Sequence, residues 1–319
     1  MTRSIAARAH AKVNLHLGVG DLRPDGFHDL VSVFQSLNLS DTVTLEVDTD
    51  ADWIESGSIV TGLTATGMDA AWVPTDETNL AWRGVDKLVE HFRARHGMGE
   101  CPPVRIHIHK GIPTAGGMAG GSADAAAALV ATHALLTERF PAATPDTLLE
   151  LAAELGSDVP FTLQGGTMLG TGRGEQLTPM LSRGTYHWVL VFFKEGLSTP
   201  RVFAELDTLR EQGVDAGPVM DTEGLSKALL TGNPRELAAR LHNDLEVPAR
   251  QLRPDVERMR QAGVAGGALA GMVSGSGPTV AFLCESELHA RDLLDDLLAD
   301  GAYSGTIAHG PAKGAHLIR

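Results

Sequence analysis

The chain contains the segment Lys110-Gly-Ile-Pro-Thr-Ala-Gly-Gly-Met-Ala-Gly-Gly-Ser122, which lies between two stretches of different periodicity. The preceding residues, Val104 to Lys110, alternate apolar and polar side chains and predict a strand with Ile106 and Ile108 facing inward. The residues that follow, Ala123 to Thr137, are rich in alanine and leucine and predict a helix. The predicted order is therefore strand, glycine-rich loop, helix.

The glycine-rich loop has the composition of an anion-binding site. Five glycines lie among residues 111 to 121, and backbone N–H groups without neighbouring side chains can approach an anion at the positive end of the helix. No Gly-Lys-Ser/Thr follows, which excludes a Walker A motif, and the glycine spacing does not fit a dinucleotide-binding fingerprint. Two interpretations remain open for the loop alone: a phosphate cradle, or a tight turn with close helix packing.

The rest of the chain mixes strands and helices without strict alternation. Strands are predicted at Ala11 to Gly20 and at Asp41 to Asp48, and a helix begins after the cap residue Asn79. A helix at Pro145 to Leu155 precedes a glycine-rich stretch, Gly165 to Gly174, that can turn the chain into a second domain. Further elements are predicted at His187–Phe193, Pro200–Glu211, Glu223–Leu230, Arg235–Leu241, Val273–Cys284 and Ser286–Ala299. With 319 residues, this mixture favours two α+β domains over a doubly wound parallel sheet.

Composition excludes several classes of protein. A formal charge of -14 repels polyanions, so we expect no nucleic-acid partner. Cys101 and Cys284 are far apart and lack CxxC spacing, which indicates neither a disulfide framework nor a cysteine metal site. No apolar stretch approaches the roughly 18 residues that span a bilayer, so we expect no membrane association and a cytoplasmic location.

Several polar residues stand where chemistry could use them. Asp158 follows a predicted helix end in Gly-Ser-Asp-Val-Pro, where Pro160 is expected to prevent the helix from continuing and Val159 to anchor the turn, so that the carboxylate is held in place. A plain cap or turn aspartate fits equally well. Lys12 stands between apolar neighbours on a predicted strand, either as a functional cation or as a solvated side chain. Phe27 and His28 leave a turn and could bind a flat ring, although a core phenylalanine beside a surface histidine is commoner.

Two further patterns leave alternatives open. His107 and His109 form an H-x-H pair on one strand face, which could ligate a metal but has no visible third ligand. The segment Val273-Ser-Gly-Ser-Gly-Pro278 is a second glycine turn, either a plain corner or another wall of the anion site.

Three segments, taken in order, resemble the motifs of the GHMP kinases, the superfamily of galactokinase, homoserine kinase, mevalonate kinase and phosphomevalonate kinase. They are Ala11-Lys-Val-Asn-Leu-His-Leu17, Pro113-Thr-Ala-Gly-Gly-Met-Ala-Gly-Gly-Ser-Ala-Asp124 and Val273-Ser-Gly-Ser-Gly-Pro278. Two more, Arg23-Pro-Asp-Gly-Phe-His28 and Gly156-Ser-Asp-Val-Pro-Phe161, are similar to the branch that phosphorylates a cytidine diphosphate-linked methylerythritol in non-mevalonate isoprenoid synthesis. The similarity runs essentially from end to end.

This resemblance implies a two-domain fold with the active site in the cleft, divided into residues 1–168 (N-terminal, ATP-binding) and 169–319. It implies ATP as phosphoryl donor, Mg²⁺ carried with the nucleotide rather than held by a dedicated metal site, Asp158 as catalytic base, and Lys12 as its partner. The residues implied for ATP binding are Pro113, Thr114, Ala115, Gly116, Gly117, Met118, Ala119, Gly120, Gly121, Ser122 and Ala123. Those implied for the small-molecule substrate, at its 2-hydroxyl, cytosine and phosphates, are Asn14, Phe27, His28, Thr199 and Phe203.

The chain also departs from the family pattern. Phe27 stands where the family often has tyrosine, and Gly117-Met118-Ala119 replaces a Gly-Leu-Gly pattern, so that a methyl group at Ala119 can crowd the anion or change the backbone path. The alternatives are a GHMP kinase for another small alcohol, such as homoserine or mevalonate, or a non-catalytic nucleotide-binding protein of the same fold. The Gly-Phe-His segment opposes the first, because those alcohols have no base to stack, and the joint presence of Lys12 and Asp158 opposes the second.

Overall fold

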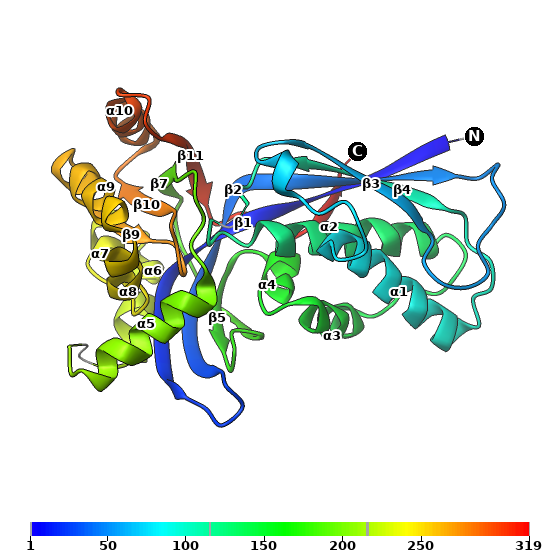
Figure 1. The fold of residues 1–319 in the computed structure, drawn as a ribbon, viewed down its shortest axis with the longest axis horizontal. Coiled ribbons are helices and arrows are strands. Elements are labelled where there is room, and N and C mark those ends of the chain that lie inside the picture. The colour runs from blue at the N-terminus through cyan, green and yellow to red at the C-terminus, as the bar shows by residue number, and fades with distance from the viewer. Residues whose placement is uncertain (1, 115, 215–216, 319) are drawn as a thin grey trace.

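Two long, paired strands run through the protein. A computed structural model describes residues 2–114, 116–214 and 217–318. Strand β1 (Thr2–Leu22) pairs with β2 (His28–Asp48) in an antiparallel hairpin of 21 residues on each side. Both predicted N-terminal strands are parts of this hairpin. In Figure 1 the hairpin extends from the end where both termini lie, past the helices of the larger part of the molecule, to the smaller part.

The larger sheet has eight strands. Five follow the order β12-β1-β2-β4-β3, while β5 pairs with β2, β6 pairs with β5, and β8 pairs with β1. The added strands are β3 (Val60–Gly67), β4 (Val104–Lys110), β5 (Thr167–Thr171), β6 (Gln176–Pro179), β8 (His242–Asn243) and β12 (His316–Ile318). Strand β4 shows the predicted alternation, with Ile106 and Ile108 buried, and β3 pairs parallel to it. Because β3 and the first half of β2 carry weaker alternation, the sequence did not predict them.

Four helices cover one face of this sheet, as Figure 1 shows. They are α1 (Leu80–His96), α2 (Gly120–Leu136), α3 (Pro145–Leu155) and α4 (Val159–Gln164), and a short 3₁₀ turn, η1 (Ala70–Trp72), precedes them. Asn79 caps α1 by accepting the N–H of Ala81, as its sequence position predicted. Helix α2 begins at Gly120, three residues earlier than expected, so the last glycines of the loop already belong to its first turn.

The smaller sheet is antiparallel, in the order β11-β7-β10-β9. Its strands are β7 (Tyr186–Phe192), β9 (Ala270–Val273), β10 (Val280–Cys284) and β11 (Ser304–Gly310). The helices around it are α5 (Thr199–Glu211), α6 (Glu223–Thr231), α7 (Pro234–Ala238), α8 (Glu246–Leu252), α9 (Pro254–Ala265) and α10 (Glu287–Leu298). The fold is thus α+β, as predicted, and it contains two sheets.

The chain crosses repeatedly between the two sheets. The expected domain boundary after residue 168 falls inside β5, which pairs with β2 in the larger sheet, and the smaller sheet begins only at β7. At the C-terminus β12 returns to pair with β1. The division into 1–168 and 169–319 therefore stays a prediction. No helix in the described part of the chain is both long and apolar enough to cross a bilayer.

Candidate active site

Two adjoining cavities lie where the N-terminal hairpin, α5 and the two glycine turns meet. The larger has a volume of about 600 Å³ and the smaller about 170 Å³. Asp158, Arg173, Thr199 and Phe203 line both of them. Lys12 and Asn14 line the smaller cavity, whereas Phe27 and His28 line the larger. Side chains from distant parts of the sequence therefore surround one continuous site.

Lys12 is buried, with only 5% of its surface exposed, so the alternative of a solvated strand lysine is wrong. Shifts in the β1–β2 register fall on both sides of the Lys12–Asn14 segment, and such irregularities re-aim side chains. Lys12 Nζ donates a hydrogen bond to Asn14 Oδ1 at 2.6 Å and lies 4.0 Å from Asp158 Oδ2. Burial lowers the pKa of Lys12, and the nearby carboxylate of Asp158 partly offsets that shift.

Asp158 lies between two helices, directly before α4. The predicted end of the preceding helix is confirmed, because α3 ends at Leu155. The sequence did not predict the second helix, α4; Pro160 lies in its first turn, where the missing N–H costs nothing. Thr162 of α4 donates through Oγ1 to the backbone oxygen of Ser122 at 3.0 Å. This bond ties the helix that follows Asp158 to the start of α2, so the carboxylate has a fixed place beside the loop.

The glycine-rich loop is anchored by buried charges. The carboxylate of Asp41 accepts hydrogen bonds from the N–H groups of Gly111, at 2.7 Å, and Ile112, at 2.9 Å. Lys110 Nζ forms ion pairs with Asp41 and, at 2.8 Å, with Asp124. Burial opposes the charge of Lys110, but the two carboxylates outweigh it and raise its pKa, while burial raises the pKa of Asp124 well above its usual range despite Lys110.

The second glycine turn is a wall of the site. A β-carbon on Gly117, whose φ is +75°, would come within 2.2 Å of the backbone oxygen of Ser274, so only glycine fits this contact. A β-carbon on Gly275 would lie 3.2 Å from Lys12 Nζ. Asn243 Nδ2 donates to the backbone oxygens of Val273 and Gly275 and holds the turn in place. The plain-corner interpretation of this turn is therefore excluded.

Ala119, where the chain departs from the family pattern, adopts a backbone conformation that favours glycine. Ala119 has a φ of 62°, the left-handed conformation that costs a residue with a β-carbon about 1–2 kcal/mol. It lines the smaller cavity together with Gly117. Ala115, which the resemblance also implied for ATP binding, lies outside the described residues.

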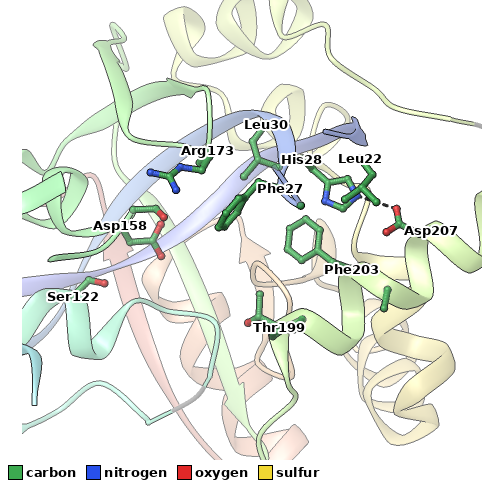
Figure 2. A pocket seen from close by; sticks show the side chains of 14 residues that line it. Leu22, Phe27, His28, Leu30, Ser122, Asp158, Arg173, Thr199, Phe203 and Asp207 are labelled. Atoms are coloured by element: carbon green, nitrogen blue, oxygen red, sulfur yellow. Dashed lines mark hydrogen bonds and ion pairs between the residues drawn. The ribbon is translucent and has the colours of Figure 1, made fainter. Parts of the chain in front are cut away.

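The far end of the larger cavity is aromatic (Figure 2). Phe27 is half-exposed at the tip of the β1–β2 hairpin, while His28 is buried. The His28 and Phe203 rings are 5.1 Å apart, inclined by 32°. Asp207, one helical turn after Phe203 on α5, pairs with His28 Nε2 at 2.9 Å. This end can accept a flat aromatic ring.

Sequence reasoning missed two charged residues of the site, Arg173 and Asp207. Arg173 stands between two glycines in the stretch that had been interpreted only as a turn, and Asp207 follows Phe203 at the helical spacing i, i+4. That spacing was a usable signal for Asp207. Thr199, which was implied, shares a hydrogen bond of 2.8 Å with Ser276 of the second glycine turn.

The H-x-H pair has an ordinary environment. His107 exchanges hydrogen bonds with Thr64 and Thr66 of β3, and His109 also contacts Thr66. In residues 2–114, 116–214 and 217–318, no cluster of three histidine, cysteine or acidic side chains could hold a metal ion.

Comparison with known families gives two matches along the chain. Residues 79–166 match the model of the GHMP kinases N-terminal domain, and residues 225–302 match that of the GHMP kinases C-terminal domain. The first match contains the glycine-rich loop and Asp158, and the second contains the second glycine turn.

Curated relatives are similar over nearly the whole chain. The 4-diphosphocytidyl-2-C-methyl-D-erythritol kinase of Corynebacterium diphtheriae is 51% identical, with 98% of each chain covered, and that of Nocardia farcinica is 53% identical, with 98% of this chain and 96% of the relative covered. A crystal structure of 4-(cytidine 5'-diphospho)-2C-methyl-D-erythritol kinase, 30% identical, superimposes with a TM-score of 0.70 over 97% of this chain and all of the other. The mevalonate kinase of L. major, at 15% identity and a TM-score of 0.70, covers 96% of each chain and shares the fold.

Proposed function

The chain belongs to the GHMP kinases and is about half identical to curated 4-diphosphocytidyl-2-C-methyl-D-erythritol kinases. From this premise we propose how its residues perform the reaction of such a kinase. It is an ATP-dependent kinase of a small-molecule alcohol in the non-mevalonate route to isoprenoids. The γ-phosphoryl group of ATP is transferred to the 2-hydroxyl of 4-diphosphocytidyl-2-C-methyl-D-erythritol, and ADP leaves.

One observation carries the substrate assignment: an aromatic end and a charged end share one cavity. Phe27, His28 and Phe203 supply two stacking rings and an imidazole for the cytosine. Asp158 lines the same cavity and faces Lys12 across 4.0 Å. A substrate with a base at one end and a reactive hydroxyl at the other fits both, whereas homoserine and mevalonate have no base for the aromatic end.

The proton of the attacking hydroxyl goes to Asp158. The substrate oxygen bonds to the γ-phosphorus while the carboxylate accepts the proton of the hydroxyl. The bond between the γ-phosphorus and the oxygen that bridges it to the β-phosphate breaks, and ADP is the leaving group. Lys12, oriented by Asn14, stabilises the negative charge that develops on the oxygen. Burial of Lys12 strengthens this interaction because little water screens it.

The phosphates of ATP would bind backbone N–H groups of the glycine-rich loop between residues 116 and 122, at the N-terminus of α2. The buried ion pairs of Lys110 with Asp41 and Asp124 hold this loop in place. Mg²⁺ supplies charge neutralisation when bound with the nucleotide, and usually needs only one or two protein oxygens. Ser122 lines the larger cavity and would supply one such oxygen, so the chain fits a metal carried by the nucleotide.

The proposal is tested by ATP turnover with Mg²⁺ and four acceptors: 4-diphosphocytidyl-2-C-methyl-D-erythritol, homoserine, mevalonate and phosphomevalonate. We expect ADP to form only with the cytidine compound. Turnover with another acceptor alone would retain the kinase and reject the cytosine-binding role of Phe27, His28 and Phe203. No turnover with any acceptor would favour a non-catalytic nucleotide-binding protein.

A further inference from the structure

Arg173 stands at the tip of the β5–β6 turn and is held there by a tight backbone geometry. Gly172 and Gly174 on either side have φ angles of +72° and +99°, which strongly favour glycine. The N–H of Leu30 in β2 donates to the oxygen of Gly172 at 2.8 Å, and the N–H of Arg173 donates to the Glu175 carboxylate at 2.7 Å. The turn is therefore attached to the long hairpin, and its arginine has a defined origin.

The side chain of Arg173 extends along the cavity wall. Its guanidinium carbon lies 5.0 Å from the centre of the Phe27 ring, a cation–π contact. Figure 2 shows the guanidinium directed toward the side of the cavity where Asp158 lies, with Phe27 between it and Phe203. Among the described residues that line the larger cavity, Arg173 is the only lysine or arginine.

The diphosphate of the bound substrate would bring negative charge into the cavity near Arg173. The base of the substrate would bind at the aromatic end and its reactive hydroxyl near Asp158. The diphosphate that joins them would therefore lie along the part of the cavity between Phe27 and Asp158. The protein carries a formal charge of -14, and Asp158 adds a carboxylate to the same cavity. Lys12 is already bonded to Asn14 and faces Asp158, so it serves the hydroxyl end.

We propose that Arg173 binds the diphosphate of the acceptor and thereby selects alcohols that are linked to a nucleoside diphosphate. This inference rests on the proposed function and identifies a residue that gives it specificity. A guanidinium presents its N–H groups in a planar fork that matches two phosphate oxygens, and it can keep its contact with the Phe27 ring while it does so. The same residue thus joins the base-binding end to the catalytic end.

Binding of nucleosides to Arg173→Ala tests the proposal without catalysis. Isothermal titration with cytidine and with cytidine diphosphate should show that the wild type prefers the diphosphate. In the variant, we expect affinity for the diphosphate to fall about 10- to 50-fold and affinity for cytidine to change less than about threefold, because only the diphosphate loses a charged partner. In turnover assays the KM for the acceptor should rise similarly, with the KM for ATP nearly unchanged.

Matched variants separate the diphosphate contact from other effects. Arg258→Ala removes the same charge from α9, at a residue that lines neither cavity, and should leave both affinities unchanged. Arg173→Lys keeps the charge and should retain part of the preference for the diphosphate. Arg173→Gln, which removes the charge but keeps polarity, serves if the alanine variant does not fold.

The outcomes distinguish this proposal from the proposed function. Unchanged affinity of Arg173→Ala and Arg173→Gln for cytidine diphosphate would overturn the role of Arg173, even if the wild type phosphorylates the cytidine acceptor. An equal loss for cytidine and its diphosphate would also overturn it, because Arg173 would then only support Phe27. Failure of the wild type to phosphorylate any cytidine compound would reject the function, whatever the titrations show.

Discussion

The glycine-rich loop, for which we propose phosphate binding, comes from one continuous segment, residues 113–123. The aromatic end of the cavity takes its side chains from the β1–β2 hairpin, the β5–β6 turn and α5. Buried charges hold the loop: Lys110 is 3% exposed and has two carboxylate partners. The aromatic end is more open, with Phe27 51% exposed and an Asp207–His28 pair at its rim. From this difference we expect a preformed site for the phosphates of ATP and a more adaptable site for the acceptor.

The largest effect, on the free energy of unfolding, should follow from removing Lys110, the buried cation that anchors the glycine-rich loop. Lys110→Met leaves Asp41 and Asp124 buried without a positive partner, and breaking a buried ion pair in this way costs about 3–5 kcal/mol of unfolding free energy. Chemical denaturation measures the loss. Lys87→Met is the control, since its pair with Glu154 is partly exposed and should contribute at most about 1 kcal/mol. Equal losses in the two variants would show that the loop does not depend on its buried anchor.

The next largest effect is expected on kcat, from a change at Asp158. Asp158→Asn keeps the size of the side chain but cannot take the proton, so kcat should fall about 10²-fold or more. The affinities for ATP and for cytidine diphosphate should stay close to those of the wild type in equilibrium titrations. Near-normal turnover would remove Asp158 from the role of base.

The pH dependence of kcat/KM tests the role of Lys12, the buried cation beside Asp158. Because the charged form of Lys12 is the useful one and burial lowers its pKa from 10.5, kcat/KM should decline as pH rises, beginning below the pH expected for an exposed lysine. In Lys12→Arg the group stays protonated, so activity should be lower but this alkaline decline should disappear. An identical decline in both enzymes would assign it to another group.

The smallest effect is expected at the rim of the aromatic end. Asp207→Asn removes the charge that faces His28 Nε2 but preserves a hydrogen-bonding group, so the KM for the cytidine acceptor should rise about three- to tenfold while kcat stays within twofold. Asp207→Glu should restore part of the affinity. A loss confined to kcat would contradict a role in positioning the base-binding histidine.

Prediction from the sequence succeeded where function depends on local order. The strand, glycine loop and helix at residues 104–137 were predicted correctly, apart from a helix start three residues too late, because periodicity and alanine content are local properties. It failed for Arg173, whose meaning depends on which ring the β5–β6 turn reaches, and for the burial of Lys12, which an alternating strand pattern does not reveal. The helix at Pro160 was missed because proline both ends and begins helices.

The sequence by itself determined the α+β class, the glycine-rich loop between a strand and a helix, and the family through three ordered motifs. Each of these depends on short stretches of neighbouring residues. Only the tertiary structure decided that Lys12 lies 4.0 Å from Asp158 and that the turn at residues 273–278 packs against Gly117. It also decided that four residues line one cavity: Phe27, His28, Phe203 and Arg173. These residues are far apart along the chain. Their proximity follows from the long hairpin and from the packing of two sheets, which depend on the whole sequence at once.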